Sequence, residues 1–303
     1  MARIKNFIEN NFSLLLLLGC AVGFFTPSFG AWASQIVIFL TASLIFLSCA
    51  DIKPSEFLKV DIFQMALFTI LRFAVFPLIL FYAMRHYFPE YAVGTLLLAL
   101  MPAGVAVASL CSMGRANVAL GLSLTIITSL LAPAFIPGVF SFLGQVVKVD
   151  IMSLFMTLVM VILVPIFLYF GVFSRFKKIN SWVSQYNKSS AIVILSLVLV
   201  IVVATQKREF LANLDVIYIG LMVMTGLFAI FYLFGILYSL VVPKDQKIPY
   251  IFASGAMNNS LAVGLAFAYF DAKVTLFLVL SEIVWSVYVA LAQWVLSKRR
   301  VTS

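Results

Sequence analysis

Long apolar segments separated by short polar connections make up most of the chain. A helix that crosses a bilayer needs about 20 mostly apolar residues, within a range of about 17–25. The pattern therefore predicts ten transmembrane helices, at residues 11–27, 31–49, 62–84, 91–113, 117–144, 151–173, 189–205, 214–240, 248–270 and 274–296. The longest polar stretch, residues 174–188, is expected to connect the sixth helix to the seventh.

Two of these segments contain a helix-breaking patch. The first reads LALMPAGVAVASL at residues 98–110, and the second reads SGAMNNSLAVGLA at residues 254–266. Pro102 lacks the N–H that a helix needs, and Gly104 permits unusual backbone angles. In hydrocarbon, a broken helix is tolerated only where it faces protein or a wet cavity. A packing kink would explain either patch alone, but a matched pair of interrupted helices indicates a transporter's binding site.

The two halves of the chain resemble each other. Residues 101–125 align without a gap on residues 257–281, so that both patches and both following connections coincide. Five helices per half is an odd number, which gives the halves opposite orientations in the membrane. We therefore predict an all-α integral membrane protein with one polytopic domain over residues 1–303. Residues 11–146 form its first inverted repeat and residues 151–298 its second, and the discontinuous fourth and ninth helices cross near the midplane.

Side chains at the two patches are candidates for substrate binding. Unwinding exposes half-helix ends, whose N-termini attract anions and whose C-termini attract cations. The candidate substrate-binding residues are Pro102, Ala103, Gly104, Asn258, Asn259 and Ser260.

Two charged residues lie well inside predicted helices. Arg72 and Glu282 are on the order of 12–15 Å from the starts of their segments at 1.5 Å per residue. Charges at this depth are costly and are functional candidates by default. We expect them to face each other or the polar patch of the ninth helix, the alternative being an ion pair that only fixes two helices. Thr125 and Ser254, beside the two patches, complete the candidate ion-site region.

Composition and charge exclude several classes of protein. Of the 303 residues, 64% are hydrophobic and 10% are charged, whereas a soluble domain has roughly 25% charged residues. The net charge of +9 does not indicate a nucleic-acid partner, because the basic residues gather at segment ends. Cys20, Cys49 and Cys111 are expected to be free thiols, and no metal-ligand cluster is visible. A phosphate-binding loop and an H-E-x-x-H motif are both missing, so we expect no enzyme and no cofactor.

Basic residues in the connections predict the orientation, since cytoplasmic loops are enriched in Lys and Arg. With the N-terminus inside, the outer connections hold Arg85, Lys148, Lys207, Arg208 and Lys273, and the inner segments hold Arg3, Lys5, Lys53, Lys59, Arg115, Arg175, Lys177, Lys178, Lys188, Lys244, Lys247, Lys298, Arg299 and Arg300. Both termini are therefore expected in the cytoplasm and the protein in the cell inner (plasma) membrane.

A cleaved signal peptide is the alternative for the first segment, because residues 31–33 mimic an A-x-A site. We expect the segment to be retained as the first helix, since it completes the first repeat.

The chain resembles the bile acid:sodium symporter family in the regions around both patches. The matching features are the break at Pro102 and Gly104, the Asn-Val-Ala-Leu of residues 117–120, Thr125, the Leu-Leu-Ala-Pro of residues 130–133, and the second patch at residues 257–270. The resemblance implies a panel of helices 1, 2, 6 and 7 and a core of helices 3–5 and 8–10. It also implies that the substrate binds between panel and core, which move to give alternating access.

The sodium ligands that the resemblance implies are mostly replaced. Thr125 is kept. The other implied ligand positions hold different residues in this chain, namely Arg72, Val107, Ala108, Gly121, Ser254 and Asn258. The implied site loses its carboxylate and gains a cation, so we expect sodium coupling to be weak or absent. The guanidinium of Arg72 is expected to take the region that the ion fills in the family. Glu282 is then either a proton carrier or the partner of Arg72.

The sequence therefore predicts a secondary active transporter in the lipid bilayer that moves a small or amphipathic organic anion, with sodium or a proton as the coupling ion. One alternative is an arsenite or auxin-type efflux carrier of the same superfamily. Cys111 speaks mildly against the arsenite variant, because it lies well past the break at Pro102. The other alternative is a non-transporting sensor. Substrate identity, transport direction and oligomeric state stay open.

Overall fold

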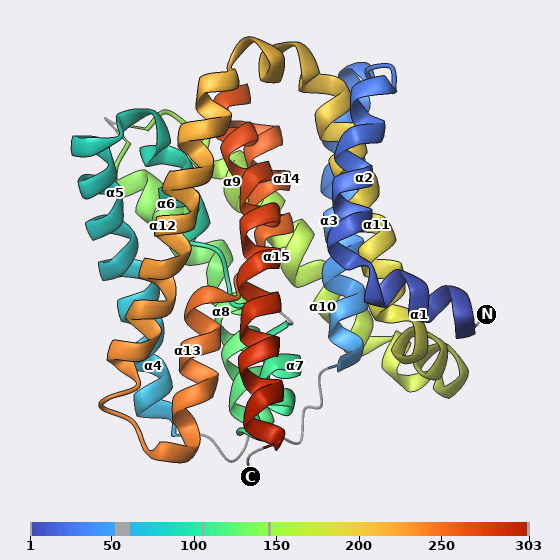
Figure 1. Ribbon diagram of the computed structural model, residues 1–303, viewed down its shortest axis with the longest axis vertical. Helices are drawn as coiled ribbons and strands as arrows, with labels where there is room; N and C mark the ends of the chain where they lie inside the picture. The colour runs from blue at the N-terminus through green and yellow to red at the C-terminus, as the bar shows by residue number, and fades with distance from the viewer. Residues whose placement is uncertain (1, 52–60, 105, 145–146, 302–303) are drawn as a thin grey trace.

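The computed structural model describes residues 2–51, 61–104, 106–144 and 147–301, and these residues are helical for most of their length. Within this part of the chain, seven helices are long and apolar enough to cross a membrane: Gly30–Ser48, Ile62–Tyr87, Val118–Phe142, Ile151–Arg175, Asn180–Ala212, Ile217–Tyr238 and Ala272–Leu296. Shorter apolar helices include Leu14–Phe25 and Asn259–Tyr269. This is the architecture of a multi-pass membrane protein (Figure 1). Lys53 and Lys59, two of the basic residues used for orientation, lie outside the described residues.

The first half of the chain contains a break where the sequence predicts one. Its α-helices are α1 (Ala2–Asn10), α2 (Phe12–Phe25), α3 (Ala33–Ser48), α4 (Ile62–Ile70), α5 (Phe76–Tyr87), α6 (Ala92–Ala99), α7 (Ala106–Met113) and α8 (Val118–Phe142). The expected fourth span is thus divided into α6 and α7. The short helix α1 was not predicted, and it packs against α11 and α2.

The second half contains the corresponding break. Its α-helices are α9 (Ile151–Leu158), α10 (Val164–Gly171), α11 (Lys177–Ala212), α12 (Leu214–Tyr238), α13 (Lys247–Gly255), α14 (Asn259–Tyr269) and α15 (Ala272–Val301). The expected ninth span is divided into α13 and α14. The prediction that residues 174–188 form a connection was wrong, because α11 begins at Lys177 and runs unbroken for 36 residues.

A single widened turn divides each of two other spans. The π-helical segment η4 (Leu71–Val75) joins α4 to α5, and η6 (Val159–Leu163) joins α9 to α10. Pro77 and Pro165 stand in the first turn of the helix that follows each segment. Proline cannot donate the usual helical hydrogen bond, so the turn before it rearranges. The rearranged turn η4 carries Arg72 into the interior.

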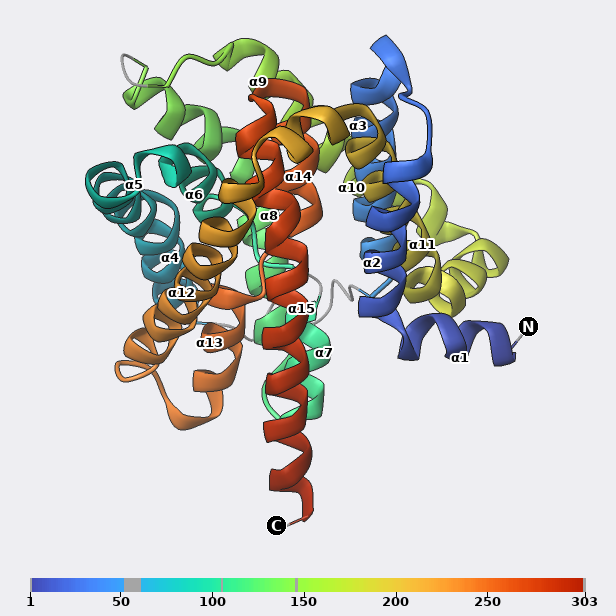
Figure 2. The same cartoon turned by 45° about the horizontal axis from the view of Figure 1, so that its top comes forward.

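The helices form two groups. In one group α2 and α3 pack on α11, and α10 packs on α3. In the other group α5 packs on α6, α7 and α13 pack on α8, and α12 packs on α13 and α15. Figures 1 and 2 show the first group on the right, beside the N-terminus, and the second on the left and in the centre. We call them the panel group and the core group. They meet where α14 contacts α3 and where α15 contacts α2 and α11.

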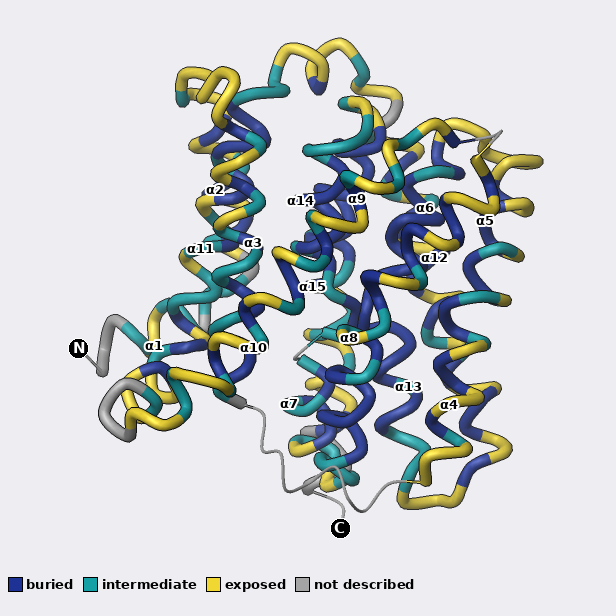
Figure 3. Tube along the Cα trace, turned by 180° about the vertical axis from the view of Figure 1, so that it is seen from behind, coloured by how far each residue is buried: buried dark blue, intermediate teal, exposed yellow. Residues whose placement is uncertain are grey.

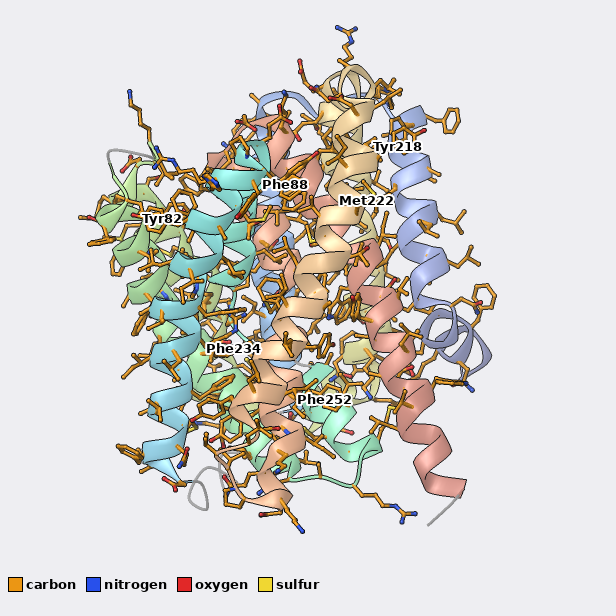
Figure 4. All side chains as sticks on the ribbon, turned by 60° about the vertical axis from the view of Figure 1, so that its left-hand side comes forward. Tyr82, Phe88, Tyr218, Met222, Phe234 and Phe252 are labelled. Carbon is orange, nitrogen blue, oxygen red and sulfur yellow. The ribbon has the colours of Figure 1, made fainter. Side chains whose placement is uncertain are left out.

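Burial follows this arrangement. The most buried backbone runs through the middle of the core group, and exposed positions lie on the outer helix faces (Figure 3). Many exposed side chains are large and apolar, among them Tyr218 at 72% and Met222 at 70% exposure on α12 (Figure 4). A large apolar exterior marks a surface that is covered by another apolar phase, which for a multi-pass membrane protein is lipid.

Candidate functional site

The two helix-breaking patches meet in the interior. Ala103, in the gap between α6 and α7, forms an isolated antiparallel bridge with Met257, in the gap between α13 and α14. The amide of Asn258 donates to the carbonyl of Pro102 at 2.9 Å. Two interrupted helices thus satisfy part of their freed backbone by pairing with each other, as an unwound segment away from water requires.

The close approach of the two backbones depends on a glycine. The amide of Gly104 donates to the carbonyl of Ala256 at 2.7 Å. A Cβ atom at position 104 would lie 3.0 Å from the carbonyl oxygen of Met257 and 3.2 Å from that of Ala256. Glycine therefore permits the pairing because it has no side chain at the contact.

Two threonines on α8 bind the remaining polar groups of the first patch. The amide of Ala103 donates to Oγ1 of Thr128 at 3.0 Å, and that hydroxyl donates to the carbonyl of Leu124 at 2.6 Å. The hydroxyl of Thr125 lies 3.2 Å from the carbonyl of Gly104. The sequence indicated Thr125 but not Thr128, because a threonine in a membrane helix normally bonds back to its own helix. The hydroxyl of Thr128 donates to its own helix and also accepts from the amide of Ala103.

Arg72 caps the C-terminal end of α6. Its side chain is 1% exposed; Nη1 donates to the carbonyl of Ala99, and Nη2 donates to that of Met101 at 3.3 Å. The guanidinium carbon lies 5.9 Å from the ring centroid of Phe231. Carbonyls at a helix C-terminus carry partial negative charge, so the cation stabilises the end of the broken helix. The guanidinium thus bonds to carbonyls beside the first patch and not to Asn258.

The expected pairing of Arg72 with Glu282 does not occur. Both side chains are 1% exposed, but within the described part of the chain the guanidinium bonds to backbone carbonyls, and Oε1 of Glu282 has no hydrogen-bond partner. The physical reason is that the carbonyls of Ala99 and Met101 already accept from the guanidinium, although its Nε–H has no partner among the described residues. Glu282 instead lies with the polar patch of the ninth helix, which was the other arrangement expected, because both line the same cavity.

The start of α14 is capped by its own polar patch. Oδ1 of Asn258 accepts from the amide of Leu261 at 3.2 Å and from the hydroxyl of Ser260 at 2.9 Å. The first amides of a helix have no partner within the helix, and its dipole is positive at this end. Asn258, Asn259 and Ser260 all border the same cavity, so the N-terminus of α14 faces it.

A cavity of about 170 Å³ lies between the panel and core groups at this point. Its core-side lining is Ala103, Gly104, Ala106, Thr125, Ile126, Ser129, Met257, Asn258, Asn259, Ser260, Glu282 and Trp285. Its panel-side lining is Phe12, Leu44, Ile45, Ser48, Cys49, Ile166, Ala191, Ile192 and Leu195. Of the predicted substrate-binding residues, Pro102 alone is not in this lining; it acts through its carbonyl. Of the predicted ion-site region, Thr125 and Glu282 line the cavity, whereas Arg72 and Ser254 do not.

Three of the positions where the family resemblance implies sodium ligands offer no free side-chain oxygen. Val107 is fully buried. A Cβ at Gly121 would lie 3.0 Å from the sulfur of Cys111. The hydroxyl of Ser254 donates to the carbonyl of Tyr250 at 2.9 Å and is 0% exposed. These three positions supply no carboxylate, so they do not fit sodium as the implied site would bind it, whereas Thr125 and Asn258 keep side-chain oxygens in the cavity lining.

Several cavity residues were not among those predicted from the sequence. Trp285 lies one helical turn after Glu282, and Ser48 and Cys49 come from the panel group. The i, i+3 spacing of Glu282 and Trp285 places them on one face of a helix, which is a signal that could have paired them. The panel residues carry no comparable signal, because apolar and small side chains are common throughout these helices.

Comparison with known proteins places the chain among transporters. The family model described as "Sodium Bile acid symporter family" matches residues 30–214. The chain is 26% identical to the "Uncharacterized sodium-dependent transporter YocS" of Bacillus subtilis over 278 residues, covering 89% of this chain and 85% of that protein. It is 24% identical to the "Probable sodium/metabolite cotransporter BASS1, chloroplastic" of Arabidopsis thaliana, covering 88% of this chain and 68% of that protein.

Proposed function

The chain belongs to the sodium bile acid symporter family, and we propose that this secondary transporter carries a small organic anion through the cavity between its panel and core groups. The observation that carries the proposal is the pairing of the two unwound segments at Ala103 and Met257. This pairing supports a site at which two half-helices, α7 and α14, begin at one cavity. Their first residues, Ala106 and Asn259, both line it. The dipole of a helix favours an anion at its N-terminus, and amides that capping leaves unpaired can bind it.

Alternating access is supported by the position of the cavity. It is bordered by both helix groups, whose contacts include α14 against α3 and α15 against α2 and α11. Movement of the panel group relative to the core group would open the cavity to one side of the membrane and then to the other, as in other transporters with interrupted helices.

The size of the cavity favours a small substrate. Pockets for drug-sized ligands usually measure about 300–1,000 Å³, whereas this cavity has about 170 Å³. The lining is mostly apolar, with polar groups gathered at the two patches. We therefore propose a compact solute with one anionic group rather than a large amphipathic one.

We also propose that transport depends little on sodium. The names of both relatives include sodium, which favours sodium dependence. The residues of this chain at the implied sodium positions favour independence. No carboxylate is offered by Val107, Ala108, Gly121 or Ser254. The guanidinium of Arg72 donates hydrogen bonds to carbonyls at the end of α6. A fixed guanidinium provides permanently the positive charge that a coupling cation would bring.

For the membrane topology, we propose ten crossings, with residues 11–146 and 151–298 as inverted repeats and both termini in the cytoplasm at the plasma membrane. In Figure 1 the C-terminus lies at the lower end of the molecule, as does the α12–α13 connection, and the N-terminus lies at the right edge, below mid-height. That connection contains Lys244, and α13 begins at Lys247. The shared position of the C-terminus and this basic connection supports the orientation that Lys and Arg predict.

Uptake by purified protein in liposomes tests the proposal. We expect a panel of radiolabelled short carboxylates to include at least one that enters faster than into empty liposomes, with little change when external sodium is replaced by choline. Stimulation by sodium of about tenfold or more would contradict sodium independence but leave the carrier function intact. Binding of a carboxylate without any uptake would favour a sensor.

A further inference from the structure

Helix α15 places Glu282, which has an unsatisfied carboxyl oxygen, in the lining of the cavity. Glu282 is 1% exposed, and its Oε1 accepts no hydrogen bond from any described residue. Burying a carboxyl group without a partner is costly. A native protein retains such a group where a ligand supplies the missing partner, and the cavity is where this ligand would lie.

A second unsatisfied acceptor borders the same space. Asn259, the first residue of α14, is 3% exposed, and its Oδ1 has no partner among the described residues. Its Nδ2 lies 3.4 Å from the carbonyl of Ser281, the residue before Glu282. This contact ties the start of α14 to the part of α15 that carries Glu282, so Asn259 and Glu282 are neighbouring residues of the lining.

The protein supplies no positive charge to these acceptors. None of the described residues that line the cavity is Lys, Arg or His. Arg72 bonds to carbonyls at the end of α6 and does not line the cavity. On α2, the thiol of Cys20 lies within electrostatic range of Glu282, and it carries no positive charge. A ligand that carries a positive charge would therefore complement an ionised Glu282.

We propose that Glu282 and Asn259 bind a protonated amine of the transported solute. An ammonium group has three N–H donors and no acceptor, which suits two neighbouring unsatisfied oxygens. The anionic group of the same solute would lie at the adjacent N-terminus of α14. The indole Nε1–H of Trp285, also without a described partner and also in the lining, can donate to that group. The substrate class is then a small zwitterion, such as a short amino acid, and the inference rests on the proposed transport function.

Electrostatics favours a zwitterion over a simple carboxylate at this site. A carboxylate solute would place a second negative charge beside Glu282 in a cavity of about 170 Å³. Like charges in a small apolar space repel strongly, so a simple carboxylate would require a proton on Glu282. A zwitterion supplies both missing partners at once, because its ammonium group neutralises Glu282 while its carboxylate meets the helix N-terminus.

Matched pairs of solutes test the inference. The probes are alanine with propionate, 4-aminobutyrate with butyrate, leucine with 4-methylpentanoate, and phenylalanine with 3-phenylpropionate. Binding is measured by thermal stabilisation of the purified full chain, and uptake is measured in liposomes. We expect at least one amino acid to bind about tenfold or more tightly than its amine-free partner, since a hydrogen bond to a charged group contributes at least about this factor.

Two variants separate the role of Glu282 from general damage. Glu282→Gln preserves the shape of the side chain and removes its charge, and we expect it to abolish the preference for the amino acid. Glu209→Gln makes the same change at an exposed position on α11, and we expect it to keep the preference. The inference is overturned if every amine-free carboxylate binds as well as its partner, or if Glu282→Gln leaves the preference unchanged.

The experiment also distinguishes failure of the inference from failure of the proposed function. Uptake of amine-free carboxylates, with no gain from an amine, would contradict the ammonium site and leave the anion transporter standing. Preferential binding of an amino acid without uptake would keep the ammonium site and contradict transport. Absence of both binding and uptake, in protein that unfolds cooperatively, would contradict both.

Discussion

The amide of Gly104 and the carbonyl of Ala256 join two interrupted helices at 2.7 Å. These residues are 152 positions apart along the chain, and each lies at the edge of a helix break. Their hydrogen bond, together with the neighbouring bond from Asn258 to Pro102, pairs the backbones of the two helix breaks. The breaks satisfy each other's backbone, and the half-helices that follow them begin at a common cavity.

Enlarging Gly104 should disturb this contact. In Gly104→Ala the new methyl group would meet the carbonyl oxygens of Met257 and Ala256 at 3.0 and 3.2 Å. We expect the unfolding free energy to fall by about 1–3 kcal/mol, as for other overpacked sites, together with loss of solute binding. Thermal unfolding in detergent measures the effect.

The control for this prediction is Gly138→Ala. Gly138 lies in α8 with no atom within 4 Å of an added Cβ, and alanine in a helix interior is favoured over glycine. This variant should be neutral or slightly stabilised. Equal destabilisation of both variants would contradict the importance of the close approach.

Removing the hydroxyl of Thr128 should loosen the first break. Thr128→Val leaves the amide of Ala103 without an acceptor, which costs about 1–3 kcal/mol for a buried donor. Ser129→Ala is the matched control, because the hydroxyl of Ser129 bonds to Thr125 of its own helix at 2.7 Å. A drop in stability for the control as large as that for Thr128→Val would argue against a specific role for Thr128.

A double-mutant cycle tests whether Arg72 and Glu282 act independently. Arg72→Gln should destabilise the protein by about 1–3 kcal/mol, because the carbonyls of Ala99 and Met101 lose a charged donor. Since no ion pair joins the two residues, the effects of Arg72→Gln and Glu282→Gln should add within about 0.5 kcal/mol. A coupling energy well above this value would show that the side chains interact.

The contact between the panel and core groups is tight at Gly264. A Cβ on this α14 residue would lie 2.8 Å from Oγ1 of Thr41 on α3. Gly264→Ala should therefore slow uptake in liposomes by changing how the two groups pack and move. Thr41→Ala removes the clashing oxygen, so the double variant should recover much of the lost rate. If it does not recover, the clash between these two residues is not the cause.

The sequence was informative where a physical rule is strict. Hydrocarbon forbids unsatisfied backbone, so the patches at Pro102 and Asn258 predicted that two broken helices lie against protein or a cavity. The partner of Arg72 was not predictable, because a buried guanidinium can be satisfied equally well by a carboxylate or by helix-end carbonyls. The polar start of α11 was predicted to be a connection. This prediction was wrong because a helix can continue beyond its membrane-spanning segment without a hydrophobic pattern.

The central claim is that the two breaks meet, and cross-linking tests it most directly. Ala103→Cys and Met257→Cys are introduced together after Cys20, Cys49 and Cys111 are replaced by serine. Residues opposite each other in an antiparallel bridge have Cα atoms about 4.5–5.5 Å apart, which overlaps the distances that a disulfide bond spans. We predict that mild oxidation joins the two cysteines within one chain, while either single variant stays unlinked. Two thiols that remain free under oxidation, in protein that still folds, would contradict the account.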